Sequence, residues 1–207
     1  MTVGSTDSLT AATGPASAPS SSARGGRVGV AGGWVVLVAG SVVLTARPAL
    51  VSATPAPVVT LVLLFGALLV VGATWPLAPS TESAPRLGTT AAVLVGLSAF
   101  ALGRVVGGGH APLAPTVAIV VTNTLAAVAE EAFFRRLCFG LLAPAGVVWA
   151  VVGSAVLFAV VHVTSYGWWV LPLDLAAGFV LGWQRAVTGS WRAPAVTHVL
   201  VNLLMVF

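Results

Sequence analysis

Two adjacent glutamates, Glu130 and Glu131, stand at the end of an apolar run that covers residues 113–129. The 207-residue chain has only five acidic residues, and charges at bilayer depth are costly unless something uses or neutralises them. On a helix, Glu131 and Arg135 are four residues apart with the acid first, which is the better orientation for an ion pair. Glu130 lies about 100° further around the helix axis and can face elsewhere. We therefore expect one acid to be structurally paired and the other to be available for chemistry.

Two histidines and an asparagine occur in other apolar segments. His162 ends the run Phe158-Ala-Val-Val-His162, while His198 and Asn202 are four residues apart and so share one helix face. A carboxylate, alone or with an imidazole, can take a proton from water. A second histidine and an amide can donate hydrogen bonds to the oxyanion that then forms. The sequence thus places two acids, two histidines and one amide on three apolar helices. These are the side chains that a water-activating hydrolase needs.

Other polar and small residues are explained more simply by structure than by chemistry. Gly178 and Gly182 form a small-xxx-small pattern, which lets two helices approach closely. The remaining residues have these expected roles: Asp174 as a helix-end acid, His110 as a loop residue, Cys138 as a packed side chain, and Thr122 and Asn123 as hydrogen-bonding groups between helices. Because Cys138 is the single cysteine, no disulfide can form within the chain.

The composition is that of a membrane protein. Hydrophobic residues make up 58% of the chain and charged residues 7%, with a mean hydropathy of +1.05. A soluble domain needs more polar surface than this. The basic residues are nine arginines without a lysine, and they are scattered, which argues against a nucleic-acid partner. An Arg-only chain rich in Ala, Val and Gly is typical of a GC-rich bacterial genome, so we expect a protein of the bacterial cell membrane.

The apolar segments predict an all-α, polytopic membrane protein with about seven transmembrane helices. The expected spans are 28–46, 56–75, 88–106, 114–136, 146–165, 168–186 and 193–207. Residues 1–26 are rich in Ser, Ala, Gly, Thr and Pro and predict a disordered tail. The first three spans carry almost no polar groups, so residues 27–112 predict a three-helix membrane scaffold. Polar residues accumulate from Asn123 onward, which assigns the function to residues 113–207.

The placement of arginine predicts a cytoplasmic N-terminus. In that orientation two arginines, Arg47 and Arg104, lie on the outer side. The inner side carries the other seven: Arg24, Arg27, Arg86, Arg135, Arg136, Arg185 and Arg192. Such a bias is what the positive-inside rule describes.

Three motifs resemble those of one family, in the same order along the chain. They are Glu130-Glu131-x-x-x-Arg135, Phe158-x-x-x-His162 and His198-x-x-x-Asn202. The family is that of the CAAX-protease and bacteriocin-processing proteins, which are intramembrane endopeptidases, and the resemblance covers roughly residues 113–205. It implies these roles: Glu130 as general base, His162 as a group that helps to hold and activate water, His198 and Asn202 as oxyanion-binding or carbonyl-orienting groups, and Glu131, Arg135 and Phe158 as residues that stabilise the helix and shape the site.

The resemblance also implies a kind of substrate. Eukaryotic members remove the last three residues from prenylated proteins, and bacterial members resemble bacteriocin-maturation or immunity factors. We therefore expect a membrane-associated or prenylated, CAAX-type protein or a lipidated peptide, cut near its C-terminus within the bilayer. Two other classes stay open: a proton-coupled transporter, in which buried Glu and His relay protons, and a non-catalytic membrane immunity or partner protein.

Metal dependence is a separate question that the sequence leaves open. Glu130, His162 and His198 could form a zinc site with one open position. The same residues could equally activate water without a metal, and the chain has no His-Glu-x-x-His motif.

Straight antiparallel spans would keep the two histidines apart. Entering from the inner side, His162 lies ~24 Å along its helix and His198 only ~10 Å along its own. A shared site therefore requires tilted, broken or re-entrant helices around a water-lined cavity.

Overall fold

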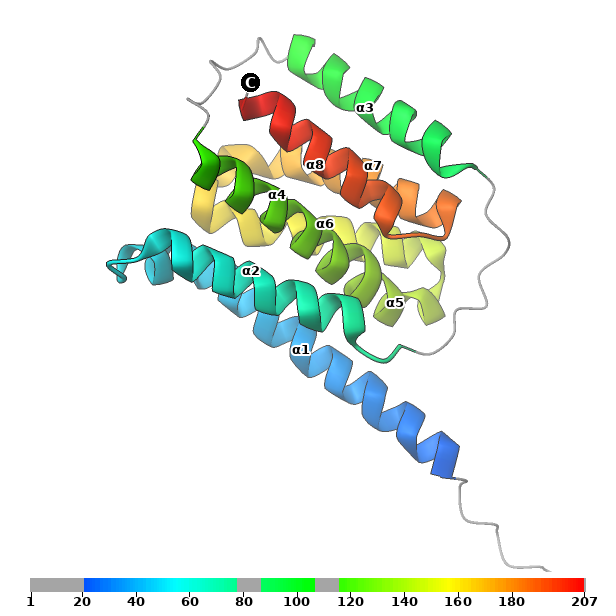
Figure 1. Ribbon diagram of the computed structural model, residues 1–207. Coiled ribbons are helices and arrows are strands. Elements are labelled where there is room, and N and C mark those ends of the chain that lie inside the picture. Colours follow the sequence, from blue (N-terminus) through cyan, green and yellow to red (C-terminus); the bar gives the residue numbers. More distant parts are fainter. Residues whose placement is uncertain (1–20, 78–86, 107–115, 207) are drawn as a thin grey trace, which may run out of the picture.

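The computed structural model describes residues 21–77, 87–106 and 116–206, and every regular element in those ranges is helical (Figure 1). In chain order the α-helices are α1 (Ser21–Ser52), α2 (Pro57–Thr74), α3 (Thr89–Val106), α4 (Val117–Glu131), α5 (Phe139–Leu142), α6 (Val147–Tyr166), α7 (Leu171–Thr188) and α8 (Arg192–Val206). A π-helical segment, η1 (Ala132–Cys138), joins α4 to α5, and two short 3₁₀ segments, η2 (Ala143–Ala145) and η3 (Trp168–Val170), precede α6 and α7. The all-α prediction is confirmed.

Two helices are longer than the apolar segments that predicted them. The first, α1, begins at Ser21, inside the predicted tail, and continues through Pro48 to Ser52. The fourth segment does not end at residue 136, because η1, α5 and η2 continue it to Ala145. Residues 1–20 of the predicted tail, and the loop residue His110, lie outside the described residues.

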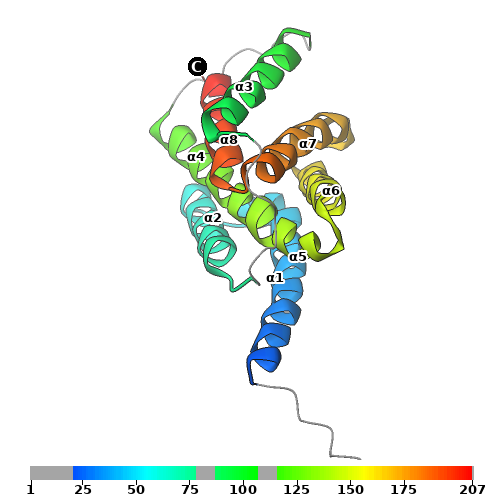
Figure 2. The same ribbon diagram turned by 90° about the vertical axis from the view of Figure 1, so that its right-hand side faces the viewer.

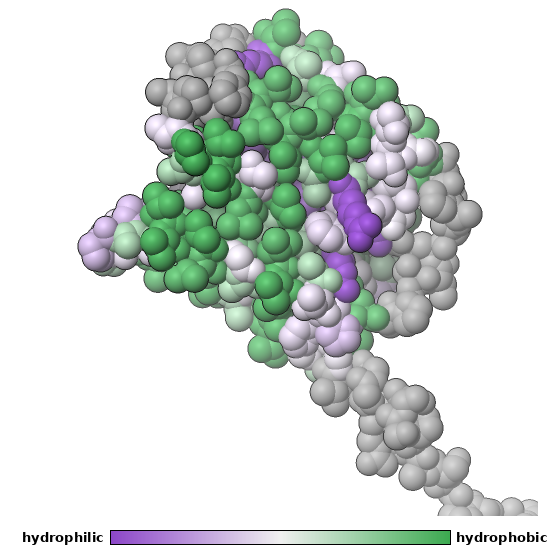
Figure 3. All heavy atoms as spheres, viewed as in Figure 1, coloured by the Kyte–Doolittle hydropathy of each residue, from purple (hydrophilic) through white to green (hydrophobic). Residues whose placement is uncertain are grey.

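The described helices have the length and surface of a polytopic membrane protein. Four spans are long and apolar enough to cross a bilayer: Gly29–Ser52, Pro57–Thr74, Val117–Ala145 and Val147–Tyr166. The number of about seven spans stays a prediction, since α3, α7 and α8 fall short of the same length or apolarity. Large apolar side chains such as Val38, Leu63 and Trp168 are exposed. The face in Figure 3 is mostly hydrophobic, as a surface against lipid must be.

A continuous rod made of α4, η1 and α5 organises the packing (Figures 1 and 2). Helices α2 and α8 pack along α4, α6 packs against α5 and α7, and α3 covers α7 and α8 from outside. The rod supplies the fully buried side chains Phe133, Phe134, Leu137 and Phe139. Between helices in a bilayer such packing stabilises the fold through van der Waals contact rather than through removal from water, and the sequence around the two glutamates is also the centre of the core.

Two glycines allow neighbouring helices to approach the rod and each other. A Cβ on Gly72 would lie 2.8 Å from the carbonyl carbon of Ala132, so α2 rests directly on η1. A Cβ on Gly178 would lie 2.8 Å from the Cα of Ala155, so α7 rests directly on α6. Gly178 thus has the packing role expected from its small-xxx-small pattern.

Arginines satisfy backbone carbonyls around the π-helical segment. Arg185 Nε, from α7, donates to the carbonyl of Arg135 at 3.1 Å. Arg136 donates from Nη1 to the carbonyl of Gly72 at 2.7 Å and from Nη2 to that of Trp75 at 3.1 Å. The last carbonyls of a helix have no partner within it, so Arg136 caps the end of α2. These contacts tie α2 and α7 to η1, the kind of helical irregularity that is frequent at functional sites.

Candidate active site

Glu131 is held in a fully buried network behind the site. Its Oε1 accepts hydrogen bonds from Arg135 Nη1 at 3.1 Å and from His198 Nδ1 at 2.9 Å. The side chains of Glu131 and Arg135 are both 0% exposed. Arg135 also donates from Nη2 to the carbonyl of Gly178 at 3.3 Å, and its guanidinium lies 4.5 Å from the ring centroid of Phe158. Glu131 is therefore neutralised on one side by an arginine and bound on the other by a histidine.

Glu130 has looser surroundings. Its Oε1 lies 3.7 Å from Nε2 of His162 and 3.7 Å from Nη1 of Arg47. Both separations are too long for a direct hydrogen bond and leave this oxygen able to bind another group. The Glu130 side chain is buried but borders a cavity.

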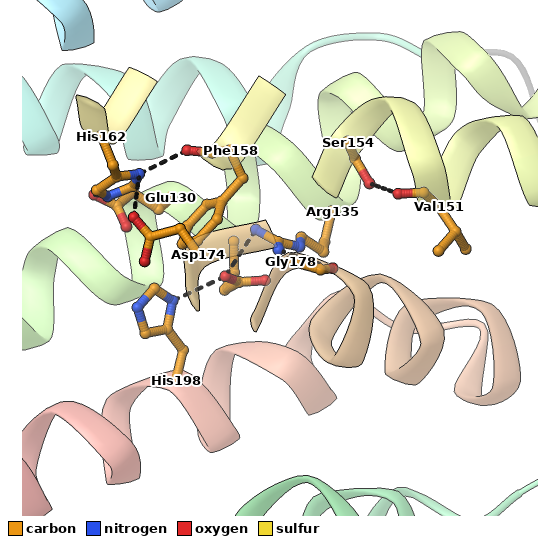
Figure 4. A network of polar contacts seen from close by, with 10 residues as sticks. Glu130, Arg135, Val151, Ser154, Phe158, His162, Asp174, Gly178 and His198 are labelled. Atoms are coloured by element: carbon orange, nitrogen blue, oxygen red, sulfur yellow. Dashed lines mark hydrogen bonds and ion pairs between the residues drawn. The ribbon is translucent and has the colours of Figure 1, made fainter. Parts of the chain in front are cut away.

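Both histidines have Nδ1 bound to an acceptor, as Figure 4 shows. His162 Nδ1 lies 2.7 Å from the carbonyl of Phe158, which can only accept, so Nδ1 carries the hydrogen. His198 Nδ1 donates in the same way to Glu131. When one ring nitrogen is held as a donor, the tautomer and the ring orientation are fixed. In each neutral histidine, Nε2 is then left as the acceptor.

A cavity of about 770 Å³ joins these groups. It is lined by Arg47, Pro48, Val51, Ser52, Leu61, Phe65, Thr122, Asn123, Ala126, Glu130, Phe158, His162, Ser165, Tyr166, Trp169, Val170, Asp174, His198 and Asn202. The four residues expected to be catalytic, Glu130, His162, His198 and Asn202, are all among them. Glu131 and Arg135 are not lining residues; they lie behind the cavity wall.

The helices bring the two histidines to one site despite their different positions along the chain. The ring of Phe158 lies between them, with centroids 4.5 Å from His162 and 5.9 Å from His198. Helix α8 has only 15 residues, and it runs obliquely past α6 rather than alongside it (Figure 1). The expected departure from straight antiparallel spans is thus met by a short, tilted helix.

Two charged residues of the site were assigned other roles from the sequence. Arg47, counted only as an outer arginine, donates from Nη2 to Ser165 Oγ at 2.8 Å and faces Glu130. Asp174, expected to be a helix-end acid, places Oδ2 3.9 Å from His162 Nδ1. Arg47 directly follows the predicted span 28–46, and the continuation of α1 to Ser52 is what places this charge within the helix.

The side chains present do not form a metal site. In the described part of the chain, no three His, Cys, Asp or Glu side chains lie close enough together to hold a metal ion. Glu130 and His162 are 3.7 Å apart, but no third such side chain of the described residues is grouped with them. We therefore derive no step through zinc.

A comparison with protein families finds a match in the second half of the chain. A family model described as type II CAAX prenyl endopeptidase Rce1-like matches residues 112–204. No curated protein and no solved structure matches the chain. The match includes all three motifs and leaves out α1, α2 and α3, so Arg47 enters the site from outside the matched region. The family is one of proteases, and together with the apolar helices it indicates an integral membrane protein. Over residues 112–204 this chain is similar to the Rce1-like family of type II CAAX prenyl endopeptidases.

Proposed function

We propose that this protein is an intramembrane endopeptidase that hydrolyses a peptide bond near the C-terminus of a membrane-associated or prenylated protein or peptide. The observation that carries the proposal is the division of the glutamate pair. Glu130 borders a cavity that also contains His162, His198 and Asn202, while Glu131 is engaged by Arg135 and His198.

Glu130 and His162 are suited to activate water. A water molecule that bridges Glu130 Oε1 and His162 Nε2 would be held by two acceptors 3.7 Å apart. Glu130 takes one proton of this water as the oxygen attacks the scissile carbonyl carbon. When the tetrahedral intermediate collapses, the C–N bond breaks and the same proton passes from Glu130 to the leaving amine.

His198 and Asn202 are suited to stabilise the oxyanion. They lie one helical turn apart on α8 and both line the cavity. The Asn202 amide can donate to the oxyanion in any protonation state, and His198 Nε2 donates when the ring is protonated. Donors fixed in a water-poor cavity act strongly because they need no reorganisation during the reaction.

A cleavage assay tests this function against the two other classes that the sequence left open. Protein purified in detergent is incubated with a library of quenched fluorogenic peptides, with and without a C-terminal prenylated cysteine motif. We expect cleavage that the Glu130→Gln variant does not show. A proton-coupled transporter or a non-catalytic partner protein would cleave no peptide in either form.

Metal dependence has its own test, since the same residues support a metal-free mechanism. We expect cleavage to persist after treatment with a strong chelator. Activity that is lost on chelation and restored by zinc would instead assign Glu130, His162 and His198 as metal ligands that move together on binding.

The orientation in the membrane is also part of the proposal. Among the arginines that the sequence assigns to the side of the N-terminus, Arg185 lies in the last turn of α7 and Arg192 begins α8. Arg47 and Arg104 lie toward the other side. The positive-inside rule then favours a cytoplasmic N-terminus in a bacterial cell membrane.

A further inference from the structure

Asp174 is an acid of the cavity that the proposed reaction does not use. It lies in the first turn of α7, its side chain is 20% exposed, and it lines the same cavity as Glu130. In the proposed mechanism Glu130 takes the proton from water, while His198 and Asn202 bind the oxyanion, so no step falls to Asp174. Because a carboxylate inside an apolar helix bundle needs a partner, a partner for Asp174 is expected.

The nearby histidine does not satisfy this carboxylate. Oδ2 of Asp174 is buried and accepts no hydrogen bond from any residue that the structure describes. His162 Nδ1 lies 3.9 Å from Oδ2 (Figure 4), which is too far for a hydrogen bond. The same Nδ1 already donates to the carbonyl of Phe158 at 2.7 Å. Asp174 is therefore not the group that orients the His162 ring.

The arginine of the cavity is engaged elsewhere. Arg47 donates from Nη2 to Ser165 Oγ and places Nη1 3.7 Å from Glu130. In the described part of the chain, the ionisable groups around Asp174 are Glu130 and the two histidines of the site. When these histidines are neutral, the cavity lining holds two carboxylates and one guanidinium. The cavity then carries an excess of negative charge, and the unmatched carboxylate is that of Asp174.

The position of Asp174 in the first turn of α7 does not supply a partner either. An acid is favoured there because the first N–H groups of a helix have no partner within it. The N-cap of α7 is Val170, however, and no side chain caps this helix with a hydrogen bond. The carboxylate borders the cavity without binding the start of its own helix.

Aromatic rings around His162 make this part of the cavity suitable for a cation. Tyr166 stacks on the His162 ring with the two centroids 5.9 Å apart, and the centroid of Phe158 lies 4.5 Å from that of His162. Both aromatic residues and Trp169 line the cavity together with Asp174. The faces of Trp, Tyr and Phe rings attract ammonium and guanidinium groups.

We propose that Asp174 binds the side chain of a lysine or arginine of the substrate, within two residues of the bond that is cut. Asp174 and Glu130 approach the same imidazole, with Oδ2 3.9 Å from Nδ1 and Oε1 3.7 Å from Nε2 of His162. Consecutive Cα atoms of a peptide are ~3.8 Å apart, so a long basic side chain close to the reacting carbonyl reaches Asp174. The identity of the occupant as a substrate rests on the proposed function, whereas the affinity of Asp174 for a cation does not.

Matched peptide pairs test this role of Asp174. Quenched peptides carry either lysine or norleucine at each of the two positions on either side of the cut bond, and norleucine keeps the alkyl chain but lacks the charge. At one or more of these positions we expect kcat/KM to be about ten- to a hundredfold higher for lysine, the usual effect of a hydrogen bond between charged groups. The ratio does not depend on how much of the protein is folded, because one preparation cuts both peptides.

Three variants assign the preference to Asp174. Asp174→Asn should abolish it, and Asp174→Lys should replace it with a preference for glutamate over norleucine. Asp174→Glu keeps the charge on a longer side chain and should shift the preference from lysine to the shorter ornithine. The inference would be overturned if the unaltered protein had no preference, if Asp174→Asn slowed both peptides equally and kept the ratio, or if Asp174→Glu left the preference unshifted.

Peptide binding distinguishes a failure of this inference from a failure of the proposed function. The same peptides, labelled with a fluorophore, are titrated with Glu130→Gln protein with and without Asp174→Asn, and Kd is measured by fluorescence anisotropy. Binding that requires lysine and Asp174, in a chain whose unaltered form cleaves neither peptide, would remove the proposed function and keep the cation site. Cleavage without any preference for lysine would remove the cation site and keep the proposed function. A protein that neither binds nor cleaves the peptides would remove both.

Discussion

Glu130 and Glu131 are adjacent in sequence and occupy opposite kinds of environment. Glu131 accepts hydrogen bonds at 2.9 and 3.1 Å from a histidine and a fully buried arginine. Glu130 has its nearest charged neighbours, Arg47 and His162, at 3.7 Å and borders a cavity. A turn of about 100° around the helix is enough to separate a carboxylate that is fixed from one that can react.

Under the proposed function, this difference is how the protein keeps a reactive acid within its core. A buried charge needs partners, and a fully paired charge cannot act as a base. Arg135 and His198 both donate hydrogen bonds to Glu131. These bonds hold α4 in place without any contribution from Glu130. His198 connects the two halves, because its Nδ1 binds Glu131 while the residue itself lines the cavity.

The largest expected effect is that of Glu130→Gln on turnover. The amide keeps the shape of the side chain but cannot take a proton from water, so we expect kcat to fall by roughly 10²–10⁴. The fold should persist, because Arg47 keeps its bond to Ser165 and its side chain is 13% exposed. Peptide cleavage and thermal unfolding in detergent measure the two effects. A variant that keeps near-normal turnover would show that Glu130 is not the base.

Glu131→Gln should act on stability instead. The change leaves the Arg135 guanidinium as an uncompensated charge at 0% exposure, which typically costs about 3–5 kcal/mol. We expect a lower unfolding temperature and poor recovery from membranes, measured beside Glu130→Gln as the matched control. Equal losses of stability in the two variants would mean that Glu131 is not the structural acid and Glu130 is not the catalytic one.

How far the sequence could predict this site depends on whether a contact is local or distant. The four-residue spacing of Glu131 and Arg135 predicted an ion pair, and the structure contains this ion pair. The His198–Glu131 bond spans 67 residues, and no periodicity within a single helix could reveal it. The π-helical segment 132–138 was missed because its apolar pattern reads as ordinary helix. Arg47 was missed because its charge was used for topology, although 83 positions along the chain separate it from Glu130, whose oxygen it faces.

His198→Ala tests the residue that connects the two environments. We expect kcat to fall by roughly 10²–10³, the usual effect of losing an oxyanion donor. Glu131 retains its bond to Arg135, so stability should fall by about 1.5–3 kcal/mol, the usual contribution of a hydrogen bond to a charged group. Asn202→Ala serves as the comparison, because Asn202 lines the cavity on the same helix. If His198→Ala destabilises the protein as much as Glu131→Gln, then His198 supports the fold rather than the reaction.

Arg47→Gln tests whether the site extends beyond the residues that match the family. Its guanidinium lies 3.7 Å from Glu130 Oε1 and binds Ser165 on α6. The separation is too long for a direct hydrogen bond, so we expect kcat to fall by less than about tenfold with little change in unfolding. Arg104→Gln, on α3, controls for the general effect of removing a positive charge. Turnover that is unaffected by Arg47→Gln alone would confine the reaction to the second half of the chain.

The smallest effect belongs to Cys138→Ser, and it separates water from thiol as the nucleophile. Cys138 is 1% exposed, lies at the end of η1 and does not line the cavity. A catalytic thiol needs a base within hydrogen-bond reach, whereas the candidate bases Glu130, His162 and His198 all border the cavity. We therefore expect this variant to keep nearly full proteolysis, measured with the peptide that the unaltered protein cleaves best. Cleavage abolished by Cys138→Ser in a chain that unfolds at the normal temperature would overturn the glutamate mechanism, and with it the contrast between the two acids.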